Sequence, residues 1–153
     1  MEKEYQRHHR DCLQCTLATL LSVPYESIPE FYKTIADMNS PTKEEDEAFD
    51  RQYWDWLKSN GYVVIGVKAK YVEGGTIEVP FVSLDEYFCL GTLKKEHRNF
   101  SHSVVLRVTN NNNIELYHDP KRNSDYDIRD LISIDFIFRI NAIVEESTPG
   151  SGS

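Results

Sequence analysis

The hydrophobic positions in the first part of the chain recur three or four residues apart, which is the spacing of one face of a helix. This pattern predicts a helix over residues 11–23, with Asp11 as its N-cap and Pro24 ending it. A shorter helix is expected over residues 29–37, because Pro29 falls in the first turn, where its missing N–H group costs nothing.

A third helix is predicted to begin in the acidic run 43–47 and to end at Gly61. Hydrophobic residues follow that run at helical intervals: Phe49, Tyr53, Trp56 and Leu57. Carboxylates are favourable near a helix N-terminus, where the backbone carries a partial positive charge. We therefore interpret the acidic run as a solvated first turn of a helix.

After Gly61 the pattern changes from helical spacing to runs of β-branched and aromatic residues. Strands are expected over residues 62–67 and 76–82, separated by a turn at Gly74 and Gly75. The chain therefore begins with helices and continues with strands.

A hairpin is predicted in the second half of the chain. Residues 103–109 and 114–118 form its strands, and the asparagines at 110–113 form its turn. A last strand over residues 133–140 shows apolar and polar residues in alternation, and we expect it to pair with the hairpin strands.

Helices followed by strands predict an α+β fold in which N-terminal helices pack on a C-terminal antiparallel sheet. A length of 153 residues suits one domain, which we expect to span residues 1–144. Residues 145–153 contain no core-forming run, and we expect them to be a flexible or artificially appended tail.

Charge and composition narrow the possible functions. A net charge of -8 opposes binding to nucleic acid, because contacts with phosphates require cations. No apolar run approaches the roughly 20 residues of a membrane span, and the charged start does not resemble a signal peptide. We expect a cytoplasmic protein. The chain has three cysteines, and a small, odd number does not fit the paired cysteines of a disulfide framework.

One of these cysteines, Cys12, falls at the expected start of the first helix, where the helix N-terminus favours the thiolate. His102 precedes one hairpin strand, and Asp119 follows the other. Because the start of one antiparallel strand lies beside the end of its partner, we expect His102 and Asp119 to meet. A thiolate, an imidazole and a carboxylate in line form the triad of a cysteine hydrolase.

The tetrahedral intermediate of such a reaction needs hydrogen-bond donors for its oxyanion. Gln6 lies six residues before Cys12 and is expected to offer its side-chain amide, beside the backbone N–H of Cys12 itself.

The order of these residues resembles the papain-like cysteine peptidases. The stretch from Gln6 through Asp11 and Cys12 into an apolar helix is similar to the active-site start of the branch that trims double-glycine leader peptides from bacteriocins. That family also carries a His before a hydrophobic strand and an Asp-Pro pair one hairpin later, matched by His102 and Asp119. The resemblance implies a papain-like fold, a peptide or protein substrate, and no cofactor or metal.

A narrower resemblance links the chain to uncharacterised phage and bacterial proteins that share the motifs Cys-Leu-Gln and His-Asp-Pro. These motifs stand here at residues 12–14 and 118–120. The chain departs from the leader peptidases at Leu13, where they place glycine. Leu13, His118 and Trp54 are our candidates for substrate contacts.

Other interpretations of the same residues remain open. His8, His9, Cys12 and Cys15 are possible zinc ligands, although packing four ligands around a helix start is awkward. Cys12 and Cys15 also form a Cys-x-x-Cys pair, but no strand precedes it as in redox proteins of the thioredoxin type. A papain-like binding module without activity, or a deamidase or acyl transferase with the same triad, are the alternatives to a peptidase.

Overall fold

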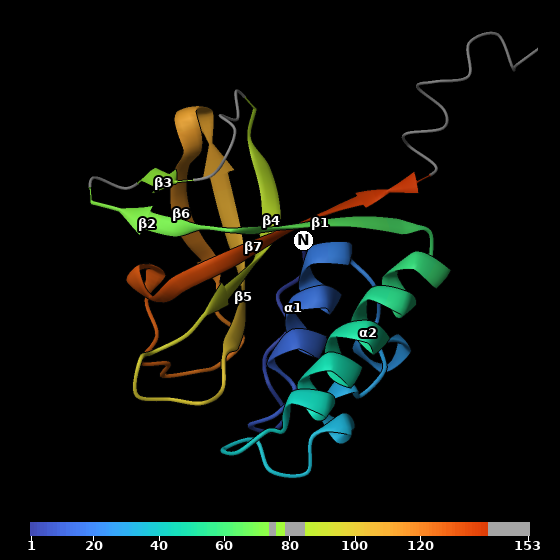
Figure 1. The fold of residues 1–153 in the computed structure, drawn as a ribbon. Coiled ribbons are helices and arrows are strands. Elements are labelled where there is room, and N and C mark those ends of the chain that lie inside the picture. The colour runs from blue at the N-terminus through green and yellow to red at the C-terminus, as the bar shows by residue number, and fades with distance from the viewer. Residues whose placement is uncertain (74–75, 79–84, 141–153) are drawn as a thin grey trace, which may run out of the picture.

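The computed structural model describes residues 1–73, 76–78 and 85–140. The expected Gly74–Gly75 turn, the end of the strand predicted over 76–82, the tail 145–153 and the end of the domain at residue 144 lie outside these residues. The described part is an α+β structure with its helices at the N-terminal end, as the sequence predicts (Figure 1).

The first helix, α1, spans Cys12–Leu21, close to its predicted range. Asp11 occupies the N-cap position, but its side chain makes no capping hydrogen bond. The helix predicted over 29–37 is instead a single 3-10 turn, η2, over Phe31–Thr34, after a similar turn, η1, over Tyr25–Ser27.

The long helix α2 spans Lys43–Ser59 and confirms the interpretation of the acidic run. Thr42 and Glu45 form a capping box that the sequence analysis did not identify, with the Glu45 N–H donating to Thr42 Oγ1 over 3.1 Å and the Thr42 N–H donating to Glu45 Oε1 over 2.9 Å. The helix ends before Gly61, whose φ of 84° is accessible to glycine at low cost.

A seven-stranded antiparallel sheet forms the rest of the described chain, in the order β1-β7-β4-β5-β6-β3-β2. Its strands are β1 (Tyr62–Lys68), β2 (Lys70–Val72), β3 (Thr76–Glu78), β4 (Tyr87–Leu93), β5 (His102–Thr109), β6 (Asn113–His118) and β7 (Leu131–Arg139). Short 3-10 turns, η3 (Asn110–Asn112) and η4 (Ile128–Asp130), precede β6 and β7.

The sheet curls on itself because its two edge strands, β1 and β2, are joined by a single residue. That residue, Ala69, donates its backbone N–H to the carbonyl of Ile132 over 3.2 Å. The two edges of the sheet, β1 and β2, are therefore consecutive in the chain, and β2 lies near β7.

The expected neighbours of the last strand were wrong. β7 pairs with β1 and β4, and the hairpin strands β5 and β6 pair with each other. β4, which the sequence analysis did not identify, separates β7 from the hairpin. At its centre, Gly91 faces Leu106 so closely that an added Cβ would lie 2.5 Å from a leucine methyl carbon.

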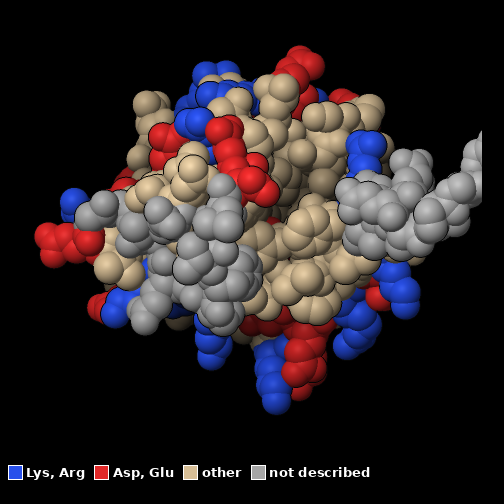
Figure 2. Space-filling view, turned by 90° about the horizontal axis from the view of Figure 1, so that it is seen from above, with Lys and Arg blue, Asp and Glu red and all other residues tan. Residues whose placement is uncertain are grey.

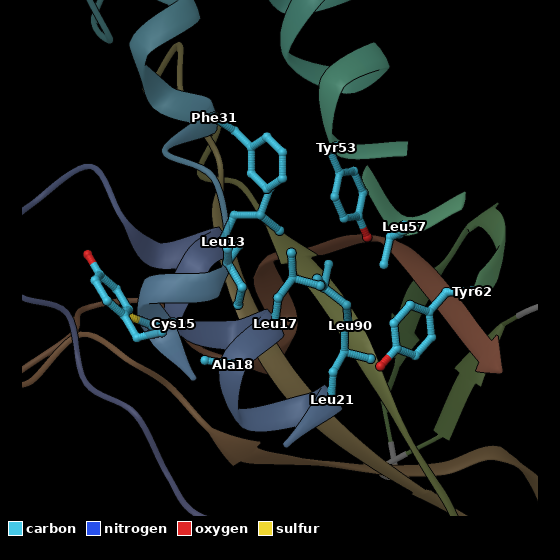
Figure 3. Packing of buried hydrophobic residues seen from close by; sticks show 12 residues of the cluster. Leu13, Cys15, Leu17, Ala18, Leu21, Phe31, Tyr53, Leu57, Tyr62 and Leu90 are labelled. Atoms are coloured by element: carbon cyan, nitrogen blue, oxygen red, sulfur yellow. The ribbon is translucent and has the colours of Figure 1, made fainter. Parts of the chain in front are cut away.

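Two hydrophobic clusters lie on opposite faces of the sheet. One fills the inside of the curl and includes Leu93, Val104, Leu106 and Ile134. The other joins the helices to the outer face of β4, and Figure 3 shows its members around α1. In that view Leu13 points toward Phe31 in the second cluster, and α1 is thereby fixed against β4 and β5.

The surface carries both signs of charge. Seen from above, most Lys and Arg side chains lie toward the margins, and uncharged residues occupy much of the middle, where a group of acidic side chains also reaches in (Figure 2). Among the described residues, neither α-helix combines the length and apolar character that a bilayer crossing requires.

Candidate active site

The first turn of α1 lies against the start of β5. Thr16 of α1 donates its hydroxyl to the backbone carbonyl of Ser103 over 2.9 Å, which fixes the helix relative to the strand. Cys12, the first residue of the helix, and His102, the first residue of β5, consequently lie at the same end of the structure.

His102 and Asp119 meet as the hairpin topology predicts. The imidazole Nε2 lies 2.6 Å from Asp119 Oδ1, and the same carboxylate oxygen accepts the backbone N–H of Lys121 over 2.9 Å. A bulge in the β5–β6 pairing, where Val105 faces His118 and Leu106 faces Leu116, adjusts the position of Asp119 beyond the strand end. Nε2 is therefore engaged by the carboxylate, and Nδ1 is left for the thiol.

Cys12 and His102 change each other's pKa. Burial by itself would raise the pKa of the Cys12 thiol, but hydrogen bonds and charge from His102, with further hydrogen bonds from Ser103, lower it overall. Burial alone would lower the pKa of His102, yet the hydrogen bonds to Asp119 and Cys12 raise it to about 9. Both shifts favour a thiolate–imidazolium pair at neutral pH.

The carboxylate of Asp119 remains ionised in this arrangement. Burial opposes ionisation, but the hydrogen bond from His102 and the imidazolium charge lower the pKa of Asp119 below its usual value. An ionised Asp119 accepts the proton on Nε2, and it thereby fixes the orientation of the ring.

The loop before the helix is held by a buried carboxylate. Asp11 is 1% exposed, and its Oδ2 accepts the backbone N–H of Arg7 over 3.1 Å and the hydroxyl of Tyr25 over 2.7 Å. Gln6 is tied to the Asp119 loop, because its backbone N–H donates to the carbonyl of Pro120 over 2.8 Å.

The side chain of Gln6 is oriented by one hydrogen bond. Its Nε2 donates to the carbonyl of His8 over 2.9 Å, which leaves the second amide hydrogen for another acceptor. Gln6 and Cys12 line the same cavity, and the N–H of Cys12, in the first turn of α1, has no partner within the helix. These two donors are suited to an oxyanion hole.

The cavity beside Cys12 has a volume of about 560 Å³. The cavity is lined by residues 6–10, Cys12, residues 36–39, residues 100–102, Lys121, Arg122 and Tyr126. The segment 36–39 reaches the cavity because the helix expected there ends after η2. A peptide segment of a few residues fits such a volume.

Tyr126 is a site residue that the sequence analysis missed. Its ring stacks on the imidazole of His102 with the centroids 4.8 Å apart and the planes inclined by 19°. Tyr126 is buried and covers one face of the imidazole. It lies in a loop with no periodic pattern, and nothing in the sequence separates it from the other tyrosines.

The three candidates for substrate contacts lie away from the cavity. Leu13 is 6% exposed in the helical core, as successive helix positions point in different directions. His118 is buried on the other side of Asp119, where its Nε2 meets the carbonyl of Glu4 over 2.5 Å and its ring packs on Tyr5. Trp54 is 48% exposed on α2, near Gly66 of β1.

The residues considered as zinc ligands do not converge. His8, His9 and Cys12 line the cavity, but Cys15 points into the core and is fully buried. Within the described ranges, no three His, Cys, Asp or Glu side chains are grouped closely enough to hold a metal ion.

Comparisons with protein family models, curated proteins and solved structures give no match to this chain. The resemblance to papain-like peptidases is therefore carried by the order of Gln6, Cys12, His102 and Asp119 in the sequence.

Proposed function

We propose that this protein is a papain-like cysteine hydrolase that cleaves an amide bond in a peptide or protein. The observation that carries the proposal is the hydrogen-bonded series of Cys12, His102 and Asp119 at the edge of an open cavity. A buried structural cysteine needs no imidazole partner, and an isolated surface thiol has a pKa near 8.5.

In the proposed reaction the Cys12 thiolate attacks the carbonyl carbon, and a C–S bond forms while the carbonyl oxygen becomes an oxyanion. The N–H groups of Gln6 and Cys12 donate to this oxyanion. The intermediate collapses, the C–N bond breaks, and Nδ1 of His102 gives its proton to the leaving amine.

Water then completes the cycle. His102, now neutral, removes a proton from the water as it attacks the thioester, a C–O bond forms and the C–S bond breaks. The acid product leaves, and the thiolate and imidazolium are restored. Asp119 keeps the ring oriented through both steps, and Tyr126 limits access of solvent to one face of it.

Incubation with a peptide mixture of defined composition, followed by mass spectrometry, tests the proposal. The wild-type protein and the Cys15→Ala control are expected to cleave the same bonds, while Cys12→Ala leaves every peptide intact. A mass gain of about 1 Da without cleavage of the peptide chain would identify a deamidase, because a side-chain amide becomes an acid, and joining of two peptides would identify a transferase.

Activity that persists in Cys12→Ala would contradict the assignment of the nucleophile. A role as a binding module predicts a different outcome, in which a partner is retained equally by the wild type and by a Cys12→Ala/His102→Ala double variant.

A further inference from the structure

The cavity beside Cys12 is lined by cations, although the chain as a whole carries a net charge of -8. Its Lys and Arg side chains are Arg7, Arg10, Lys121 and Arg122, and Asp37 is its only Asp or Glu among the described lining residues. The composition of the cavity is therefore opposite in sign to that of the molecule.

Arg7 contributes little to this excess of positive charge. Its guanidinium lies 3.1 Å from the carboxylate of Glu26 and stacks on the ring of Tyr25 at 3.8 Å. An exposed cation paired with a carboxylate has a weak residual field in water.

The hydrogen bonds of Arg10 are with neutral groups. One of its terminal nitrogens donates to the backbone carbonyls of Tyr32 and Ile35, and its Nε is buried without a hydrogen-bond partner among the described residues. The guanidinium is thus held in place beside η2, and among the described residues no carboxylate compensates its charge.

Lys121 and Arg122 supply positive charge from the loop that follows Asp119. Both are exposed, and Arg122 stacks on the ring of Tyr5 at 3.8 Å. Within the part of the chain that the structure describes, no carboxylate lies within ion-pair distance of Arg10, Lys121 or Arg122. By contrast, Arg98 and Arg107 on the same molecule are each paired with carboxylates.

We propose that the cavity selects an acidic peptide segment, with Asp or Glu side chains on both sides of the scissile bond. This inference rests on the proposed function. The cations come from two separate segments, with Arg10 held beside η2 and Lys121 and Arg122 in the loop after Asp119, and this distribution suits carboxylates spread along an extended chain. A single phosphate is more often held by backbone N–H groups at a helix N-terminus. Here α1 begins at Cys12, whose N–H we assign to the oxyanion of the reaction.

The apolar side chains in the same cavity fit a peptide as well. Met38 and Phe100 lie among the cations, and they can contact the aliphatic part of Glu side chains and the peptide backbone. Electrostatic attraction would raise both the encounter rate and the discrimination against basic peptides.

Two alkylating reagents of similar size test the field at Cys12 without a known substrate. Iodoacetate is an anion and iodoacetamide is neutral, and each forms a C–S bond with the thiolate as iodide leaves. The rate of alkylation of Cys12 by iodoacetate, divided by its rate with iodoacetamide, is measured by peptide-resolved mass spectrometry. A positive electrostatic potential at the thiolate raises this ratio. In Lys121→Gln/Arg122→Gln we expect this ratio to fall about three- to tenfold.

A matched control removes the same net charge elsewhere. Arg51→Gln/Lys58→Gln changes two exposed residues of α2 that do not line the cavity, and it should leave the ratio within about twofold of the wild type. An unchanged ratio in Lys121→Gln/Arg122→Gln, or an equal fall in the control, would overturn the inference.

Protection of Cys12 from iodoacetamide separates a peptide from other anions. Hexaglutamate is expected to slow the alkylation of the wild type, and hexaglutamine is not. Protection by tripolyphosphate alone would assign the cations to a phosphate-bearing ligand and would contradict an acidic peptide.

Failure of the inference and failure of the proposed function give different results. If Cys12 reacts rapidly with iodoacetamide but the charge substitutions leave the rate ratio unchanged, only the substrate class is wrong. If Cys12 reacts no faster than a free thiol with either reagent, the proposed nucleophile itself is wrong.

Discussion

Cys12 and Cys15 lie three residues apart on the same helix, and their surroundings give them opposite chemistry. Cys12 is half-buried at the cavity, and contacts with His102 lower the pKa of its thiol despite burial. Cys15 is fully buried in the helical core, where burial and the nearby Asp11 carboxylate raise the pKa of its thiol. The difference shows that the surroundings, and not the residue type, determine whether the pKa of a thiol is lowered or raised.

The two sides of α1 are also stabilised in different ways. The core side is held by apolar packing of residues such as Leu17, which is fully buried. The cavity side is held by hydrogen bonds from separate loops, among them those that Asp11 accepts and the one between His102 and Asp119. We therefore expect substitutions on one side to change reactivity and substitutions on the other side to change stability.

Removal of the imidazole should have the largest effect on this contrast. His102→Ala is expected to lower the rate at which iodoacetamide alkylates Cys12 at neutral pH by about 30-fold, since only about 3% of a thiol with an ordinary pKa of about 8.5 is ionised there. Mass-spectrometric rate measurements on the wild type and the variant check this. His97→Ala, at an exposed position outside the cavity, is the control, and a similar loss in that variant would show that the effect is nonspecific.

Loss of the carboxylate partner should have the next largest effect. In Asp119→Asn the pKa of His102, which the wild type holds at about 9, is expected to fall to about 7 or below. NMR titration of the ring protons measures both values. A pKa near 9 in the variant would mean that Asp119 does not stabilise the imidazolium.

The same pair makes a pH-dependent contribution to stability. Because the pKa of His102 is raised in the folded state, its contribution is fully present below the unfolded-state value near 6.5 and is lost as the pH rises through about 9. Asp119→Asn should weaken this alkaline loss of stability. Urea unfolding of the wild type and the variant at about pH 6 and about pH 10 measures the difference.

Replacing Cys15 should change the stability of the protein and not its reactivity, and replacing Cys12 should do the opposite. Cys15→Ala is expected to lower the free energy of unfolding by about 1 kcal/mol, through loss of buried contacts, and to leave Cys12 reactive. Cys12→Ala should remove the reactive thiol and change the stability by less than about 0.5 kcal/mol. Equal stability losses in the two variants would remove the distinction between the two sides of the helix.

Among the variants that should slow peptide cleavage, the smallest effect is expected at the loop that presents Gln6. Tyr25→Phe removes the hydroxyl that donates to Asp11, and it should cost about 1 kcal/mol of stability and slow peptide cleavage a few-fold. The measurement is urea unfolding together with the cleavage assay, and Tyr71→Phe, on β2, is the control. A faster or unchanged reaction in Tyr25→Phe would show that this anchor does not position the loop.

Local sequence patterns predicted α1, α2 and the β5–β6 hairpin, but they missed β2 and β4, overextended η2 into a helix and did not give the pairing of the last strand. The helix α2 and the β5–β6 hairpin were predicted because spacing and turn residues act over short distances. The pairing of β7 with β1 and β4 joins residues far apart in the chain, such as Tyr62 and Arg139, and no local pattern encodes it. β4 was missed because its apolar run shows no alternation, as both of its faces are covered.

The same distinction applies to the site. His102 and Asp119 could be predicted to meet because one hairpin brings them together. Tyr126 and the cations at Lys121 and Arg122 reach the cavity through irregular loops, and their positions depend on tertiary packing. Leu13 was expected at the substrate because of its place beside Cys12, although the next position on a helix points about 100° away.

The pH dependence of Cys12 alkylation by iodoacetamide tests the central claim most directly, with Cys15 and Cys89 as internal references in the same sample. We predict that the rate at Cys12 reaches its plateau well below the ordinary thiol pKa, while the two buried thiols, whose pKa burial raises, stay unmodified in the folded protein. A rate at Cys12 that rises only around pH 8.5 to 9, as for a free thiol, would contradict the claim that His102 activates it.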